Sequence, residues 1–451
     1  MTAIKHSATT SALLLACLTG EADAERDQRW SELVDEGIDW GQLLEFAEHH
    51  EILPLLFSGL SHARAHPAPR VVLSQLHDHF HATLLRNRLA LQCFFSVQET
   101  LAAAGIPVVL LKGMILAGTV YEHLAVRQLG DIDILVRPDQ VALARTLLEQ
   151  SDYRPVYPTS MLCDPNTQKL TTTQERIYAR YYHEITLQSA DNLLQIDLHW
   201  ALLSKLYPQS ERLEADSIWG QVRRVSLDGR SVLTLSAEHQ LIHTCIHATK
   251  DRWRRLKWVV DIDRIIRADQ LDWARLHACT QRWNSERMLR AGLGLAQELL
   301  STPLPAHASR LLLEPAARAD VSTVLRILLN PKMPEPRILR CLGINSTFLK
   351  LLDTMSCRRR YLHQALTMPR PEDEARFGSG PPNRPLWRLS RPLRVLTRCI
   401  GRIGRPRCDE ADWPDTRQYH PIRAEPELIR IDGSNRAQED AHLSRSRRKV
   451  G

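Results

Sequence analysis

The spacing of hydrophobic residues changes twice along the chain, and the changes mark its regions. From about residue 10 to residue 101, apolar side chains recur every three or four positions, which is the spacing of amphipathic helices. The same spacing returns at Ser236, ahead of an apolar stripe that includes Leu241 and Ile242, and continues to about residue 363. We therefore expect a helical N-terminal region over residues 1–101 and a helical C-terminal domain over residues 236–363.

The middle of the chain has the pattern of strands. A short apolar run over 132–136 predicts a buried strand. Two segments, 182–187 and 194–200, alternate apolar and polar positions as neighbouring strands do, and residues 189–192 predict a hairpin turn between them. Helical spacing separates these strands, so residues 102–235 are expected to form an α/β core within an α+β protein.

The formal charge is distributed unevenly. The 451 residues include 59 Lys and Arg against 52 Asp and Glu, a net charge of +7, but 21 of the basic and 12 of the acidic residues lie at positions 357–451. The preceding residues therefore have a net charge of −2, so the basic composition is weak evidence that the main body binds nucleic acid. Residues 364–451 are rich in Pro and Arg and are predicted to be a basic, largely disordered tail.

One part of this tail has helical spacing. Arginines recur every three or four residues from Arg388 to Arg405, and Leu389, Leu393 and Ile400 recur on another face. A short basic amphipathic helix would bind an anionic membrane, a phosphate backbone or an acidic partner weakly and reversibly. The alternative is a helix that packs its apolar stripe against the main body.

Cysteine usage and hydropathy indicate a cytoplasmic protein. The nine cysteines are scattered and include no C-x-x-C pair, which is not the pattern of a disulfide framework. No apolar run approaches the roughly 18 residues of a membrane span. Residues 11–17 resemble the core of a signal sequence, but the run is short and few positive charges precede it. The first amphipathic helix of a folded domain is the favoured interpretation.

Three aspartates are candidates for metal binding. Asp131 and Asp133 stand two positions apart at the start of a predicted strand, so their side chains share one face about 7 Å apart along the backbone. Two such carboxylates repel each other unless a cation lies between them, and oxygen ligands suit Mg²⁺. Asp197, on another predicted strand, would supply a third carboxylate, and Glu184 competes for this role. Three carboxylates around two Mg²⁺ ions can polarise a phosphate and activate an attacking hydroxyl.

A second element favours phosphate binding. The apolar run over 107–111 predicts a buried strand that ends at Lys112-Gly113, before a helix. A helix N-terminus offers free N–H groups to a phosphate, Gly113 allows close approach, and Lys112 adds a positive charge. Arg127, three residues before Gly130, would neutralise charge on a leaving pyrophosphate.

The order of these motifs resembles the polymerase-beta-type nucleotidyltransferase superfamily, and more closely a bacterial family of uncharacterised nucleotidyltransferase-like proteins. The resemblance extends over about residues 30–350. It takes in residues 47–56, 104–113, 127–136, 196–200, 243–247 and 256–258 with Asp261. The chain departs from the usual superfamily pattern in two ways. Lys112-Gly113 stands where Gly-Ser is common, and the interval from Gly113 to Asp131 is longer.

The resemblance implies a core of a small mixed sheet with helices, and an Mg²⁺-dependent enzyme. Such an enzyme moves a nucleoside monophosphate from a nucleoside triphosphate, such as ATP, to an acceptor hydroxyl on a small molecule, a peptide or RNA. It also implies Asp131, Asp133 and Asp197 as the residues for catalysis and metal binding. The candidates for nucleotide binding are Lys112, Gly113, Arg127 and Gly130. The alternatives are a non-catalytic nucleotide-binding adaptor of a biosynthetic complex and a toxin-like enzyme that modifies transfer RNA.

Other polar residues have less specific patterns. Histidines recur at every fourth position from His239 to His247, which places them on one helical face and favours packing or substrate contact over zinc binding. His199 shares a strand face with Asp197, and an orienting or packing role is favoured over proton transfer. Lys257 and Asp261 are spaced for a helical salt bridge.

Overall fold

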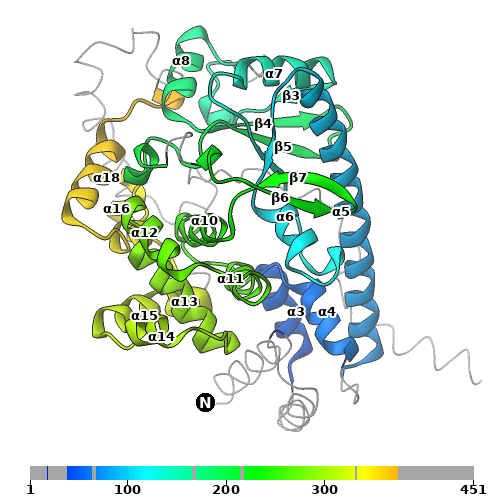
Figure 1. Cartoon of the computed structure of the whole chain (residues 1–451), viewed down its shortest axis with the longest axis vertical. Coiled ribbons are helices and arrows are strands. Elements are labelled where there is room, and N and C mark those ends of the chain that lie inside the picture. The colour runs from blue at the N-terminus through cyan, green and yellow to red at the C-terminus, as the bar shows by residue number, and fades with distance from the viewer. Residues whose placement is uncertain are drawn as a thin grey trace, which may run out of the picture. The chain divides into compact units, whose positions relative to one another are not determined.

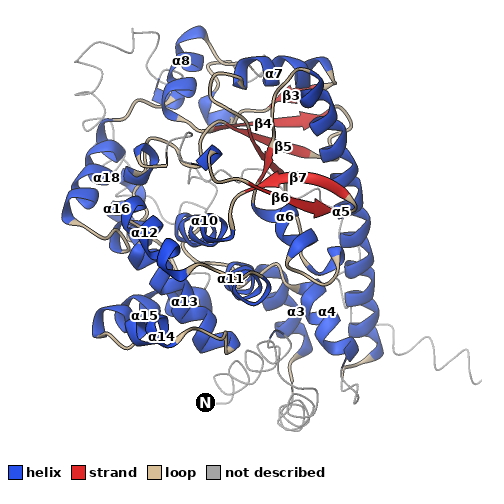
Figure 2. Cartoon of the chain, in the orientation of Figure 1, coloured by secondary structure: helices blue, strands red, loops and turns tan. Residues whose placement is uncertain are grey.

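The computed structural model describes residues 18, 38–62, 68–164, 169–213, 218–330 and 333–373, and within them a mixed sheet is surrounded by helices (Figure 2). The described strands form one seven-stranded sheet in the order β3-β4-β5-β2-β1-β7-β6. They are β1 (Val109–Leu110), β2 (Ile132–Leu135), β3 (Tyr153–Pro155), β4 (Glu184–Ser189), β5 (Gln195–His199), β6 (Arg223–Leu227) and β7 (Arg230–Thr234). The β2–β5 and β1–β7 pairs are parallel and the others antiparallel. The predicted α+β class is confirmed.

Several strands differ in extent from their predicted positions. The run over 107–111 contributes only the two-residue β1, and the strands predicted over 182–187 and 194–200 correspond to β4 and β5. Strands β6 and β7, which no individual pattern predicted, extend the sheet beyond β1. The tail helix predicted between Arg388 and Arg405 and the segment 11–17 lie outside the described residues.

A long helix lies beside the sheet and fixes the loop that precedes β2. The N-terminal helices are α3 (Trp40–His49), α4 (Leu53–His62) and α5 (Arg70–Ala103), and Figure 1 shows α5 running along the side of the strands. The buried positions of α5 follow helical spacing. Its buried Asn87 donates hydrogen bonds to the carbonyls of Leu124 (2.7 Å) and Arg127 (2.8 Å), which ties this loop to α5.

Shorter helices connect the strands, and further helices follow β7. The connecting helices are α6 (Lys112–Thr119), α7 (Val141–Gln150) and α8 (Thr172–Tyr181), with 3-10 turns η1 (Leu124–Val126), η2 (Thr159–Met161) and η3 (Pro208–Glu211). The C-terminal helices are α10 (Ala237–Lys250), α11 (Lys257–Ala268), α12 (Trp273–Trp283), α13 (Glu286–Leu300), α14 (Ala306–Leu312), α15 (Pro315–Leu329), α16 (Arg337–Leu342), α17 (Ser346–Lys350) and α18 (Met355–Thr367). Because α10 starts directly after β7 and packs against α11, α12 and α13, nearly all of its residues are buried (Figure 1).

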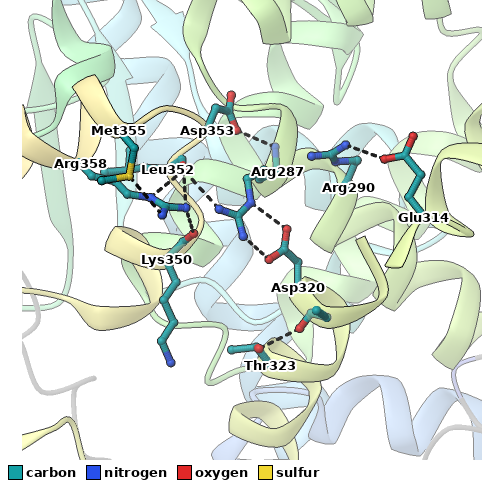
Figure 3. A network of polar contacts seen from close by, with 11 residues as sticks. Arg287, Arg290, Glu314, Asp320, Thr323, Lys350, Leu352, Asp353, Met355 and Arg358 are labelled. Atoms are coloured by element: carbon teal, nitrogen blue, oxygen red, sulfur yellow. Dashed lines mark hydrogen bonds and ion pairs between the residues drawn. The ribbon is translucent and has the colours of Figure 1, made fainter. Parts of the chain in front are cut away.

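The start of α13 is held by a carboxylate from a distant loop (Figure 3). Asp353 accepts hydrogen bonds from the backbone N–H groups of Glu286 and Arg287, both at 2.9 Å. The guanidinium of Arg287 in turn contacts both carboxylate oxygens of Asp320 on α15, at 2.9 and 2.5 Å. Asp353 therefore satisfies two N–H groups that a helix N-terminus leaves without intrahelical partners.

We expect Asp353→Ala to lower the free energy of unfolding by about 1–2 kcal/mol, the usual contribution of a capping side chain. Urea denaturation would measure it. Glu314→Ala is the matched control, because Glu314 contacts Arg290 at 3.4 Å in a half-exposed pair, and such pairs contribute about 0–1 kcal/mol. Equal losses in the two variants would contradict the capping role.

Candidate functional site

Two predicted carboxylates meet on adjacent parallel strands. Asp133 on β2 lies directly opposite Asp197 on β5, so both side chains stand on one face of the sheet. Their strand neighbours Ile132 and Ile134 point to the other face, where they are buried in the core. Asp133 is buried and Asp197 half-buried, whereas Asp131 precedes β2 and is exposed.

Lys112 and His199 contact the same oxygen of Asp133. Nζ of Lys112 lies 2.7 Å from Oδ1 and Nε2 of His199 lies 2.9 Å from it. Burial alone would raise the pKa of Asp133, but the charge of Lys112 and the hydrogen bond with His199 hold it well below its usual range. Lys112 is the first residue of α6 and has a φ of 43°, a left-handed conformation that costs energy for a residue with a side chain. The structure therefore holds this lysine against Asp133 in a strained backbone.

The hairpin of β4 and β5 brings a second layer of polar side chains to the site. Glu184 lies opposite His199 in the antiparallel register, and its Oε2 is 3.2 Å from Nδ1 of His199 and 3.1 Å from Nε2 of His183. Thr186 lies opposite Asp197, and its hydroxyl donates to Oδ1 of Asp197 at 2.7 Å. Burial lowers the pKa of His183 to about 4, although Glu184 acts in the opposite direction.

Three other carboxylates act on the pKa of Asp197. Burial, followed by the charges of Asp131, Glu184 and Asp133, holds the pKa of Asp197 well above its usual range. The hydrogen bond from Thr186 acts in the other direction and does not offset these effects. The exposed Asp131 therefore belongs to the electrostatic surroundings of the two strand carboxylates.

These residues fit a divalent cation. Ligand atoms of Asp133, Asp197 and His199 lie within 4.8 Å of one another, and the same holds for His183, Glu184 and His199. Mg²⁺ prefers carboxylate oxygens, which the first group supplies. A cation bound between Asp133 and Asp197 would also offset the repulsion that raises the pKa of Asp197.

Arg127 is occupied by a buried ion pair. Its Nε and Nη2 each lie 2.8 Å from a different oxygen of Asp261 on α11, and the Tyr121 hydroxyl donates to the same carboxylate at 2.7 Å. The predicted salt bridge between Lys257 and Asp261 is wrong. Asp261 is fully buried and faces the loop before β2, while Lys257 pairs with Glu51 of the N-terminal region.

Gly113 leaves room for the Arg127 side chain. A Cβ atom at Gly113 would lie 2.9 Å from Nη1 of Arg127 and 3.1 Å from Cδ2 of Leu129. We expect Gly113→Ala to lower the free energy of unfolding by about 1–3 kcal/mol, because buried neighbours must move. At Gly130, in contrast, a Cβ atom would meet nothing within 4 Å, so Gly130→Ala is the control, with a change within about 0.5 kcal/mol. Thermal and urea denaturation would compare them, and equal stability would contradict the packing argument.

The histidines of α10 have mainly packing contacts. His239 stacks on Trp283 and His247 lies edge-on to Trp258, each with ring centroids 4.7 Å apart. His243, between them on the same face, is buried. Its pKa is held well below the usual range by burial and then by the nearby charge of Lys112. This helix face therefore borders the site through His243.

His183 and Thr186 were not assigned roles from the sequence. Their contacts depend on the register of the hairpin, which pairs Gln188 with Gln195 and so sets Thr186 opposite Asp197. The signal was the alternation of polar residues on both strands, but alternation alone does not give the register.

A mixed sheet that sets carboxylates of adjacent strands beside a Lys-Gly helix start places the chain in the nucleotidyltransferase class. The chain belongs to the family described as uncharacterised nucleotidyltransferase, whose model matches residues 36–301, more than half of its length. The predicted family is confirmed, and membership implies a nucleotide substrate.

The chain is also similar to a solved structure, the crystal structure of an antigenic nucleotidyltransferase-like protein from Paracoccidioides brasiliensis. The two are 14% identical with a TM-score of 0.29, and the match covers 55% of this chain and 93% of that chain. A comparison with curated proteins finds no match. Among the described helices, including the 34-residue α5, none is both long and apolar enough to cross a membrane.

Proposed function

We propose that the chain transfers a nucleoside monophosphate from a nucleoside triphosphate to an acceptor hydroxyl and releases pyrophosphate. The observation that supports this most strongly is the register of the parallel β2–β5 pair, which sets Asp133 opposite Asp197. Lys112 at the start of α6 lies against the same carboxylate. Carboxylates for a divalent cation and a cation for phosphate are thus adjacent, as this reaction requires.

The proposed roles follow from these positions. Asp133 and Asp197, with Asp131 beside them, would hold Mg²⁺, which when bound polarises the α-phosphate and lowers the pKa of the attacking hydroxyl. Lys112 and the first N–H groups of α6 would bind phosphate oxygens. Arg127, which pairs with Asp261 and packs on Gly113, would hold the Lys112-Gly113 turn in place.

In the proposed reaction, the acceptor oxygen attacks the α-phosphorus of the triphosphate. A bond forms between them, and the bond from the α-phosphorus to the oxygen that bridges to the β-phosphate breaks. The electron pair of that bond leaves with pyrophosphate. The proton of the hydroxyl passes to the carboxylate of Asp197, which lies opposite Asp133 on the adjacent strand.

The test is release of pyrophosphate from each of the four common ribonucleoside triphosphates with Mg²⁺, alone and with small alcohols, peptides and RNA as acceptors. We expect release that requires Mg²⁺ and one class of acceptor. Nucleotide binding without release under every condition would contradict the enzymatic proposal and favour an adaptor. RNA as the effective acceptor would favour a toxin-like enzyme.

A further inference from the structure

A row of buried polar contacts leads from Asp133 into the protein. It runs through His199 and Glu184 to His183, and each member contacts the next: Asp133 to His199 at 2.9 Å, His199 to Glu184 at 3.2 Å and Glu184 to His183 at 3.1 Å. The exposed fractions of these residues are between 1% and 9%. The contact between Asp133 and His199 is a hydrogen bond, and the other two are close contacts between a carboxylate and a ring nitrogen.

Both ring nitrogens of His199 are engaged by carboxylates. Nε2 contacts Asp133 and Nδ1 contacts Glu184. The contact with Asp133 is a hydrogen bond and the contact with Glu184 is a close approach of the carboxylate, so rotation of the ring would lose both. The same oxygen of Glu184, Oε2, also contacts His183, so one carboxylate oxygen lies between the two imidazole rings.

One oxygen of Asp133 receives both of the side-chain contacts to this carboxylate described above. His199 and Lys112 both contact Oδ1. We propose that Glu184 and His183 are positioning residues which, through His199, keep Oδ1 of Asp133 occupied and direct Oδ2 to the metal ion beside Asp197. This inference rests on the proposed function. Contacts that orient ligands in this way typically change metal affinity or activity by 10–100-fold when removed.

Glu184→Gln tests the proposal in the full chain, because it keeps the shape and removes the charge. Mn²⁺ binding without nucleotide, measured by electron paramagnetic resonance, should weaken by about 10–100-fold. The kcat for pyrophosphate release should fall by a similar factor, with little change in the KM for the triphosphate. His183→Gln, which leaves Glu184 and His199 in contact, should give a smaller loss in the same direction. It also serves as the test if Glu184→Gln does not fold.

Glu335→Gln is the matched control. Glu335 is also a buried glutamate, paired with Arg252 at 2.7 Å, and it has no contact with the row. Its variant should bind Mn²⁺ as the wild type does, so a general effect of losing a buried charge would appear in both variants. Wild-type Mn²⁺ affinity in a folded Glu184→Gln variant would overturn the proposal.

The measurements separate this proposal from the proposed function. If the wild type releases no pyrophosphate but Glu184→Gln weakens Mn²⁺ binding, the positioning role stands and the transfer reaction does not. If the wild type is active and Glu184→Gln matches it in Mn²⁺ affinity and kcat, the reaction stands and the positioning role does not. A second bound Mn²⁺ that only His183→Gln removes would also overturn the proposal, because the histidines would then be ligands themselves.

Discussion

Asp197→Asn is expected to reduce pyrophosphate release by roughly 10²–10³-fold while the folded state becomes more stable. A bound metal ion contributes several kcal/mol to the stability of the charged transition state, and each 1.4 kcal/mol is about a factor of ten in rate. The stability gain has a different cause. Burial, followed by the charges of Asp131, Glu184 and Asp133, raises the pKa of Asp197.

The sign of the stability effect follows from proton linkage. A carboxyl whose pKa is higher in the folded than in the unfolded state contributes stability at low pH, and the contribution is lost as the pH rises through the raised value. At neutral pH the carboxyl group of Asp197 therefore opposes folding when no metal is bound, because it must either keep a proton or carry an unfavourable charge, and the neutral amide removes this cost. Urea denaturation with a chelator present would measure the gain, and a loss of stability would contradict it.

Asp133→Asn provides a contrast at the neighbouring position. It should also reduce transfer, but it removes the carboxylate partner of the buried Lys112 and of His199, so stability should fall. Asp139→Asn is the control, because Asp139 is an exposed aspartate after β2 with no place in the site. Wild-type activity in both Asp133→Asn and Asp197→Asn would rule out a carboxylate-bound metal as the basis of the reaction.

The site residues that could be predicted from the sequence lie in short segments with a regular alternation of apolar and polar positions. The alternation around Asp133 and around Asp197 predicted the strand and the side of each carboxylate, and β2 and β5 have nearly the predicted bounds. That the two strands are parallel neighbours with Asp133 opposite Asp197 was not predictable. The pairing joins segments far apart in the sequence, and its energy depends on the packing of the whole sheet.

The contacts that the sequence did not predict depend on the register of the β4–β5 hairpin or on residues far apart in the chain. A turn over 189–192 was predicted, but Ser189 still belongs to β4, where it pairs with Tyr153 of β3. A shift of one residue in the β4–β5 register would change which side chain lies opposite Asp197. The helical spacing of Lys257 and Asp261 favoured a local pair. Asp261 is fully buried, and its ion-pair partner is Arg127, which lies in a loop far away in the sequence.

Asp261→Asn should be the most destabilising of the substitutions considered, with a loss of about 3–5 kcal/mol in the free energy of unfolding. The asparagine leaves the guanidinium of Arg127, 4% exposed, without a carboxylate in the interior, and breaking one side of a buried pair costs about this much. Asp269→Asn is the matched control. Asp269 forms an equally regular pair with Arg223, at 2.8 and 2.9 Å, but in a partly exposed position, so its loss should be about 1 kcal/mol or less.

The same substitution should also affect the site, because Arg127 connects Asp261 to the Lys112-Gly113 turn. Nη1 of Arg127 faces Gly113, and Asn87 holds the backbone of Arg127 to α5. Freed from Asp261, the guanidinium would shift toward the turn that presents Lys112. We expect the KM for the triphosphate to rise several-fold at a temperature where Asp261→Asn remains folded, with no change in Asp269→Asn. Steady-state kinetics would measure this. An unchanged KM in a destabilised Asp261→Asn variant would mean that the ion pair stabilises the fold without positioning the phosphate-binding turn.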